Sequence, residues 1–122
     1  MKNLIISNGL YLLLLTGTMC SCEKKEVPAL TTDEVTDITG TSAVCGGTII
    51  GEGSGAILAN GVCWSTDSLP AIEDNKSIDN AEAGKFTSNI SGLQGATLYY
   101  VRAYATNSAG TGYGEEIGRA QV

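Results

Sequence analysis

The four cysteines are the residues of this 122-residue chain with the most reactive side chains, and they form two groups. Cys20 and Cys22 lie near the N-terminus, whereas Cys45 and Cys63 lie in the body of the chain. The chain contains no histidine, which excludes Ser-His-Asp and Cys-His catalysis and removes the commonest metal ligand. Without histidine or a CxxC spacing, Cys45 and Cys63 do not match a zinc site. We therefore expect no metal and no cofactor.

Cys45 and Cys63 leave two alternatives open. An exported chain can keep a disulfide, but the alternation of side chains along strands opposes this pair. If Val62 and Trp64 face the core, Cys63 faces outward, whereas Cys45 faces inward. A β-bulge beside Cys45 would shift the register by one residue and remove this objection. The residues thus predict either a Cys45–Cys63 disulfide or two unreactive thiols.

The carboxylates occur in pairs, which is the residue type that general acid–base hydrolysis needs. Such chemistry requires two carboxylates at a defined separation across a cleft, and these fall in expected loops or on an expected edge strand. We interpret them as solvated surface and predict no catalytic residue and no enzymatic activity. The formal net charge of −6 also argues against nucleic acid as a partner. The carboxylates in question are Glu73, Asp74, Asp79, Glu82, Glu115 and Glu116.

Tyrosines and small apolar residues alternate strictly in the stretch from residue 97 to 107, which is typical of a half-buried strand. One face of this strand carries Tyr99, Val101, Ala103 and Ala105, and the other carries Tyr100, Arg102 and Tyr104. We expect the first set to enter the core and the second to stand in water. The run NSAGTGYG that follows allows a tight reversal, so the sequence predicts a β-hairpin.

Exposed aromatic side chains beside an arginine could form a stacking surface for a sugar or a partner protein. The alternative is cross-strand pairing, which stabilises the sheet by about a few tenths of a kcal/mol per pair. The residues of this candidate surface are Trp64, Tyr100, Arg102, Tyr104 and Tyr113.

The elements that must position these residues are short strands. Sixteen glycines and only two prolines indicate turns between strands, and no window has a convincing helical period. We predict strands within residues 27–39, 41–50, 57–66, 84–93, 97–107 and 110–117, with a less ordered stretch at 67–83. Residues 118–122 lack the alternation of a finished strand, so we expect that end to fray.

The N-terminus has the pattern of an export signal. Lys2 precedes an apolar core from Leu10 to Leu15, which is shorter than the roughly 20 apolar residues of a membrane-spanning helix and fits a signal peptide. The small residue Ser21 and then Cys22 follow, which resembles the lipobox of bacterial lipoproteins. The resemblance implies a lipid on Cys22, in preference to Cys20, and a membrane anchor.

This reading divides the chain into a signal peptide at 1–21, a charged linker at 22–28 and one domain at 29–122. Removal of residues 1–21 takes away one lysine and no acid, which changes the formal net charge from −6 to −7. We expect the mature chain at the outer membrane or cell surface of a Gram-negative bacterium.

The segment GLQGATLYYVRAYATNSAGTGYG, residues 92–114, resembles the fibronectin type III family, and CGGTI and GVCWS resemble its modules on bacterial surface lipoproteins. The resemblance implies an all-β, immunoglobulin-like sandwich of seven antiparallel strands, with A, B and E in one sheet and C, C′, F and G in the other. It makes Leu93 the loop leucine and Tyr99 the corner tyrosine, whose hydroxyl bonds back to the backbone. Gly47 replaces a common tryptophan, and we expect Trp64 to fill that space.

Two functions are consistent with this reading. The first is a lipid-anchored lipoprotein whose single domain is a non-catalytic interaction or spacer module. The alternative is a glycan-binding accessory protein of a surface uptake system. The residues identify neither a protein nor a glycan partner.

Overall fold

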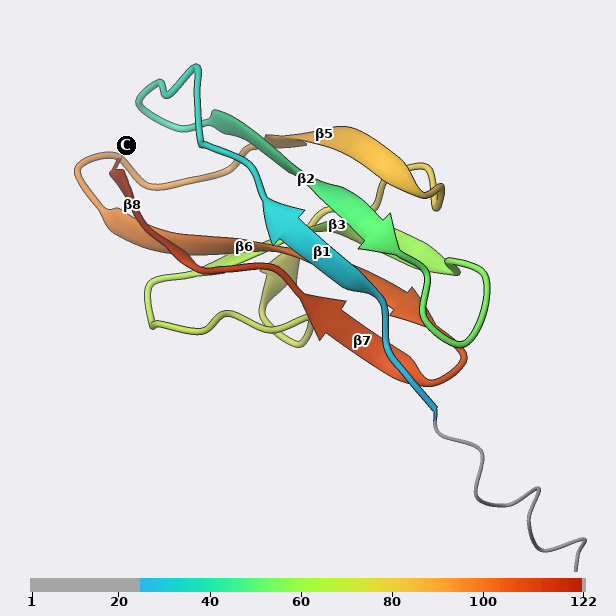
Figure 1. Ribbon diagram of the computed structural model, residues 1–122. Helices are drawn as coiled ribbons and strands as arrows, with labels where there is room; N and C mark the ends of the chain where they lie inside the picture. Colours follow the sequence, from blue (N-terminus) through green and yellow to red (C-terminus); the bar gives the residue numbers. More distant parts are fainter. Residues whose placement is uncertain (1–24, 122) are drawn as a thin grey trace, which may run out of the picture.

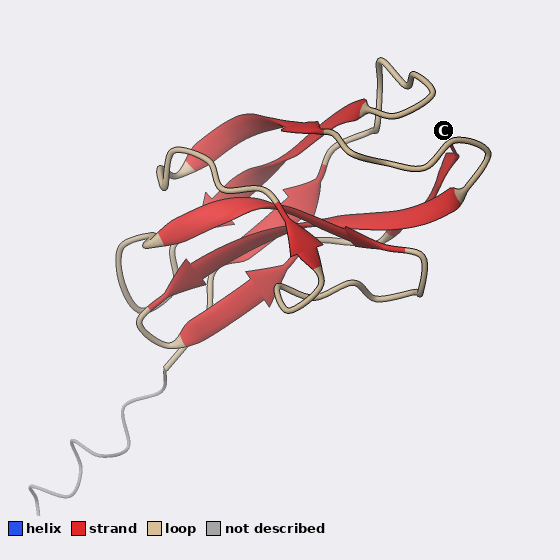
Figure 2. Cartoon of the chain, turned by 180° about the vertical axis from the view of Figure 1, so that it is seen from behind, coloured by secondary structure: helices blue, strands red, loops and turns tan. Residues whose placement is uncertain are grey.

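The computed structural model describes residues 25–121, and these residues form strands and connecting loops without a helix (Figures 1 and 2). The cysteine predicted to carry the lipid, Cys22, and the less favoured Cys20 lie outside the described residues. The strands are β1 (Ala29–Thr32), β2 (Ala43–Gly51), β3 (Ala59–Ser65), β4 (Asn75–Lys76), β5 (Gly84–Ile90), β6 (Leu98–Asn107), β7 (Gly110–Tyr113) and β8 (Ile117–Gln121).

The strands form two antiparallel sheets in a sandwich-like arrangement (Figure 1). One sheet has three strands in the order β1-β2-β5. The other has five, with β4, β3, β6 and β7 in this order and β8 also paired with β6. The three-stranded sheet matches the expected group of A, B and E, whereas the other sheet has one strand more than the four expected.

The core lies between the sheets and receives side chains from both. β6 contributes every second residue, because successive side chains of a strand point to opposite faces. Tyr99, Val101, Ala103 and Ala105 are all buried in the core, as predicted. The other sheet contributes Leu30, Ala43, Cys45, Ile49, Phe86 and Ile90.

The space at Gly47, where the resemblance places a tryptophan, is filled by neighbouring side chains. A Cβ atom at Gly47 would lie 2.6 Å from the Cβ atom of Ala103 and 3.1 Å from Cζ of Phe86. Phe86 and Ala103 are thus the nearest side chains in this space, in place of the expected Trp64, which packs half-buried against the core.

The C-terminal part differs from the prediction of one final strand followed by a frayed end. β7 pairs with β6 from Tyr104 to Asn107, and β8 pairs with β6 from Leu98 to Val101. Residues 114–116 separate the two short strands. The described chain therefore has eight strands instead of seven, and residues beyond 117 continue the sheet. Residues 117–121 form a strand because they pair with β6, although their sequence lacks alternation.

Glu26 is joined to the end of the domain where β2 and β6 finish (Figure 1). Its N–H donates to Oγ of Ser54, 2.6 Å away, and its carbonyl accepts from the N–H of Ser54 at 3.0 Å. The same carbonyl accepts from Nδ2 of Asn107 at 2.9 Å, and Nδ2 also donates to the carbonyl of Glu52 at 2.7 Å. We call this end the N-terminal pole, formed by Glu26, residues 51–58 and the turn at 107–110.

The Tyr99 side chain ties β6 to the loop that precedes it. Tyr99 is buried, and its hydroxyl accepts a hydrogen bond of 2.9 Å from the N–H of Gln94. Leu93, next to Gln94, is also buried in the core. This is the contact that the corner tyrosine of the resemblance implies.

We predict that Tyr99→Phe lowers the free energy of unfolding by about 1–3 kcal/mol, because the N–H of Gln94 loses its partner. Tyr100→Phe is the matched control, since the Tyr100 hydroxyl makes no hydrogen bond to a described residue and its ring lies on the opposite face. Urea denaturation of both variants measures the effect. An unchanged midpoint for Tyr99→Phe would contradict the structural role of this hydroxyl.

Candidate binding surfaces

The five residues of the predicted stacking surface do not share one face. Trp64 lies opposite Val101 in the β3–β6 register and therefore faces the core side. Cys63 lies opposite Arg102, and Ser65 lies opposite Tyr100. The remaining four predicted residues thus occupy the outer face of the five-stranded sheet, without Trp64. The prediction of a surface that includes Trp64 is wrong.

The outer face of the five-stranded sheet is covered by residues 69–77, which we call the cover segment. It includes β4, which pairs with β3 through Lys76 and Asn75. It starts at Leu69, whose φ of 53° lies in the left-handed region that non-glycine residues rarely adopt. The N–H of Leu69 donates to Oε2 of Glu116 at 2.7 Å, so the break between β7 and β8 supplies a carboxylate that holds this start.

Three of the predicted surface residues, Arg102, Tyr113 and Tyr104, bond to the cover segment. Nε of Arg102 donates to the carbonyl of Pro70 at 2.6 Å. The Tyr113 hydroxyl accepts from the N–H of Ile72 at 3.1 Å. The Arg102 guanidinium also lies over the Tyr113 ring, 3.8 Å from its centre, which adds a cation–π attraction.

Tyr104 is the clearest departure from the sequence prediction of a side chain in water. Its exposed fraction is 1%, and its hydroxyl donates to the carbonyl of Ser77 at 2.6 Å. Burial, followed by the charge of Asp79, raises the pKa of Tyr104 to about 12. The prediction that Tyr104 belongs to an open stacking surface is therefore wrong, because the cover segment seals it.

The cysteines of the body are both free thiols, which contradicts the disulfide alternative. Cys45 lies in the core, and the register of β2 with β5 runs through it without a shift. Cys63 lies on the outer face under the cover segment and donates to the carbonyl of Pro70 at 3.4 Å. As predicted from the alternation, Cys45 faces inward and Cys63 faces outward, and no bulge between β2 and β5 changes this.

Both thiols are poor nucleophiles at neutral pH. Burial raises the pKa of Cys45 to about 11. Burial also raises the pKa of Cys63 to about 11, with the Arg102 charge acting in the opposite direction. Because the thiolate is the reactive form, these cysteines have a packing role.

A shallow hollow of about 260 Å³ lies on the three-stranded sheet. Gly46 lies in the middle of β2, where a Cβ atom would collide with the carbonyl oxygen of Phe86. Its lining residues are Asp33, Glu34, Thr36, Val44, Cys45, Gly46, Lys85 and Thr87. Sequence reasoning missed this hollow, because it requires the alignment of β2 with β5 and the departure of the chain from β1.

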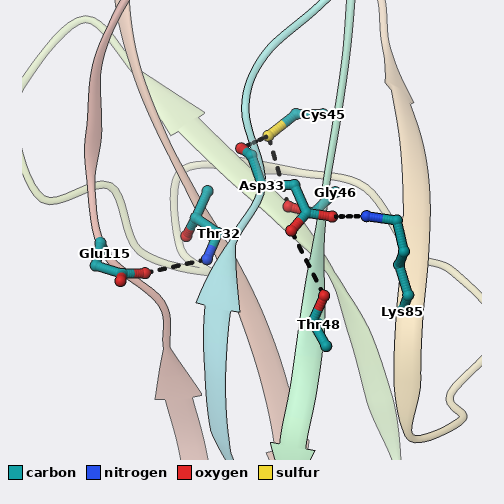
Figure 3. Close-up of polar contacts among 7 residues, drawn as sticks. All are labelled: Thr32, Asp33, Cys45, Gly46, Thr48, Lys85 and Glu115. Atoms are coloured by element: carbon teal, nitrogen blue, oxygen red, sulfur yellow. Dashed lines mark hydrogen bonds and ion pairs between the residues drawn. The ribbon is translucent and has the colours of Figure 1, made fainter.

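The polar groups beside the hollow are largely paired with one another (Figure 3). Lys85 reaches from β5 to Oδ2 of Asp33 at 2.6 Å, across β2. Thr48 donates to Oδ1 of the same carboxylate at 3.5 Å, and the Cys45 thiol donates to the Asp33 carbonyl at 3.4 Å. The exposed fractions of the Lys85 and Asp33 side chains are 69% and 27%, so the ion pair contributes about 0–1 kcal/mol. The arrangement leaves the Glu34 carboxylate without an ion pair among the described residues, and it activates no nucleophile.

Several predicted surface carboxylates instead accept structural hydrogen bonds. Asp79 accepts from the hydroxyls of Ser77 and Ser88, which joins the β4 side of one sheet to β5 of the other. Glu115 accepts from the N–H of Thr32 at 3.2 Å (Figure 3). Glu115 is exposed, as the interpretation as solvated surface expects, whereas Asp79 is half-buried. No local sequence signal reveals these bonds, because their partners lie on distant strands.

Within residues 25–121, no group of three or more potential ligands among Cys, Asp and Glu could hold a metal ion. The same residues contain no helix long and apolar enough to cross a membrane. Comparison of the chain with models of known families and with curated proteins finds no match.

Glu115 predicts a specific dependence of stability on pH. Its own N–H, and then the N–H of Thr32, hold the pKa of its carboxyl below the ordinary value of 4.5. A lowered pKa in the folded state stabilises the fold above pH 4.5, and this stabilisation is lost as the pH falls through the folded-state pKa. Glu115→Gln keeps an oxygen acceptor but does not titrate.

We therefore expect Glu115→Gln to be less stable than the wild type at neutral pH and to approach it in acid. Urea denaturation at about pH 7 and about pH 3 measures the difference. Parallel stability profiles of the two proteins would contradict the role assigned to Glu115.

Proposed function

We propose that the mature chain is a lipid-anchored lipoprotein of the outer membrane or cell surface of a Gram-negative bacterium. In this proposal its single fibronectin type III-like domain acts as a non-catalytic interaction or spacer module. The observation that carries the proposal is the N-terminal order of an apolar stretch, a small residue, Cys22 and a charged run.

The attachment of Glu26 to the domain supports a short tether. Four residue steps separate Cys22 from Glu26, and an extended chain of that length spans at most about 14 Å. Because Glu26 is bonded to Ser54 and Asn107, a lipid on Cys22 would keep the N-terminal pole close to the membrane. The loops at the other end of the sandwich would then point away from it.

Two observations support the fibronectin type III-like description. The sheet β1-β2-β5 matches the A, B and E strands that the resemblance implies, and Tyr99 bonds to the backbone beside the buried Leu93. The non-catalytic role is supported by how the polar side chains are used. The most buried of them, which are Asn60, Ser88, Tyr104 and Asn107, all bond to the chain itself.

The glycan-binding alternative receives no support from the arrangement of the aromatic side chains. Sugar rings stack on exposed aromatic faces, whereas Tyr104 is buried and Tyr113 is stacked with Arg102. Trp64 lies on the other side of the sheet.

The intact mass of the protein extracted from the membranes of its host tests the anchor. We expect a chain that begins at Cys22 and carries a diacylglycerol and an N-acyl group. Cys22→Ser should lose the lipid, whereas the control Cys20→Ser should keep it, since residue 20 lies in the part that is removed. An unlipidated chain in the soluble fraction would contradict the proposal.

A further inference from the structure

β5 is the one long strand at a sheet edge in the described part of the chain that lacks a protecting feature. It has seven residues, ends the three-stranded sheet, and pairs with β2 without a bulge (Figure 1). Exposed edges of this kind invite pairing with another chain. The only charged side chain on β5, Lys85, is already paired with Asp33.

The opposite edge of the same sheet is protected. β1 has four residues, follows Pro28, and contains a register shift at Ala29 and Leu30. β7 also lies against it, so close that a Cβ atom at Gly112 would collide with the Pro28 carbonyl. In the five-stranded sheet, β4 has only two residues, and the other edge is divided into β7 and β8, of four and five residues. This contrast within one molecule singles out β5.

The direction of the backbone groups on β5 follows from the neighbouring pairs. Val44 exchanges two hydrogen bonds of 2.8 Å with Thr36, on the β1 side of β2. Backbone groups alternate in direction along a strand, so Cys45 and Gly47 bond toward β5. Their partners there are Ser88 and Phe86.

The backbone groups of the β5 residues between these partners point away from β2, toward the open edge of the sheet. The N–H and C=O groups of Lys85, Thr87 and Asn89 therefore face outward, and none bonds to another described residue. The side chains of the same three residues are exposed. β5 thus offers a continuous row of free donors and acceptors.

The hollow lies one strand inward from this edge, on the face that carries Lys85 and Thr87. Side chains of an added strand would alternate between the two faces, so every second one would extend over Thr87 toward the hollow. Glu34 lines the hollow and has no ion pair among the described residues. With a mature net charge of −7, the surroundings favour a basic side chain at this position.

We propose that the free edge of β5 binds an extended segment of a partner protein as an additional strand, with a lysine or arginine of that segment in the hollow. Such strand addition obtains affinity from backbone hydrogen bonds and specificity from side chains in adjacent pockets. The inference rests on the interaction role proposed above and names the class of partner.

A second copy of the chain fits this edge less well. Antiparallel pairing of two β5 strands would place the two N-terminal poles at opposite ends of the joint sheet. Tethers of about 14 Å from Cys22 to Glu26 would then have to reach one membrane from both ends. A separate extended segment has no such restriction.

Amide hydrogen exchange of the full-length chain in detergent micelles tests the proposal, with two synthetic probes. One is the blocked peptide of alternating threonine and lysine, and the other has glutamate in place of lysine. With the lysine peptide at millimolar concentration, we expect exchange to slow about tenfold or more at Lys85, Thr87 and Asn89. Phe86 and Ser88, already bonded to β2, should change little, and the glutamate peptide should have little effect.

Thr87→Pro removes one outward N–H without removing a bond to β2 and should abolish the effect, whereas Thr87→Val keeps that N–H and should retain it. Thermal unfolding of both variants checks that each is folded.

If the lysine peptide does not slow amide exchange in the wild type, the proposal is overturned, and it is also overturned if both peptides slow exchange equally. Protection of the same three amides without peptide, together with a doubled mass in solution, would assign the edge to a second copy instead. Exchange at β5 does not depend on a lipid on Cys22. A negative exchange result would therefore overturn strand addition without contradicting the proposed lipid anchor.

Discussion

The two-residue repeat of β6 is the constraint on which the rest of the structure depends. This strand pairs with β3, β7 and β8, and one of its faces supplies Tyr99, Val101 and Ala103 to the core. A shift by one residue would send these side chains to the opposite face. The same repeat places Arg102 and Tyr104 on the outer face, where polar groups at the ends of their side chains bond to the cover segment. One alternating pattern therefore builds both the core and the attachment of the loop that covers the sheet.

The cover segment changes which surface is available to a partner. Aromatic residues next to an arginine suggest an open binding face when they are read along the sequence. Here the polar atoms of Arg102, Tyr104 and Tyr113 bond within the chain. The accessible unpaired groups lie elsewhere, on the backbone of β5 and at the Glu34 carboxylate beside the hollow. An interaction module can bind through its backbone in this way, and the residue types on the strand then give little indication of it.

Most of the fold could be predicted from the sequence because it follows from local alternation. The inward set on β6, the division of strands between the sheets and the Tyr99 contact all come from that pattern and from the resemblance. The burial of Tyr104 could not be predicted, because residues 69–77 have no regular pattern and are placed by bonds to distant strands. Strand β8 was missed for a similar reason, since pairing with β6 compensates for its weak local preference. The hollow could not be predicted either, because it brings together β2, the segment at 33–36 and β5, which is distant from both in the sequence.

The accessibility of Cys63 tests most directly whether the cover segment closes the outer face. Native protein would be treated with a thiol reagent without reductant, and labelled peptides would be identified by mass spectrometry before and after unfolding. Burial and a pKa of about 11 predict that Cys63 stays unlabelled in the folded protein, as does Cys45, and that both are labelled once the chain unfolds. Rapid labelling of Cys63 in the native state would show an open outer face and contradict the account. Failure of both residues to react after unfolding would contradict the two free thiols.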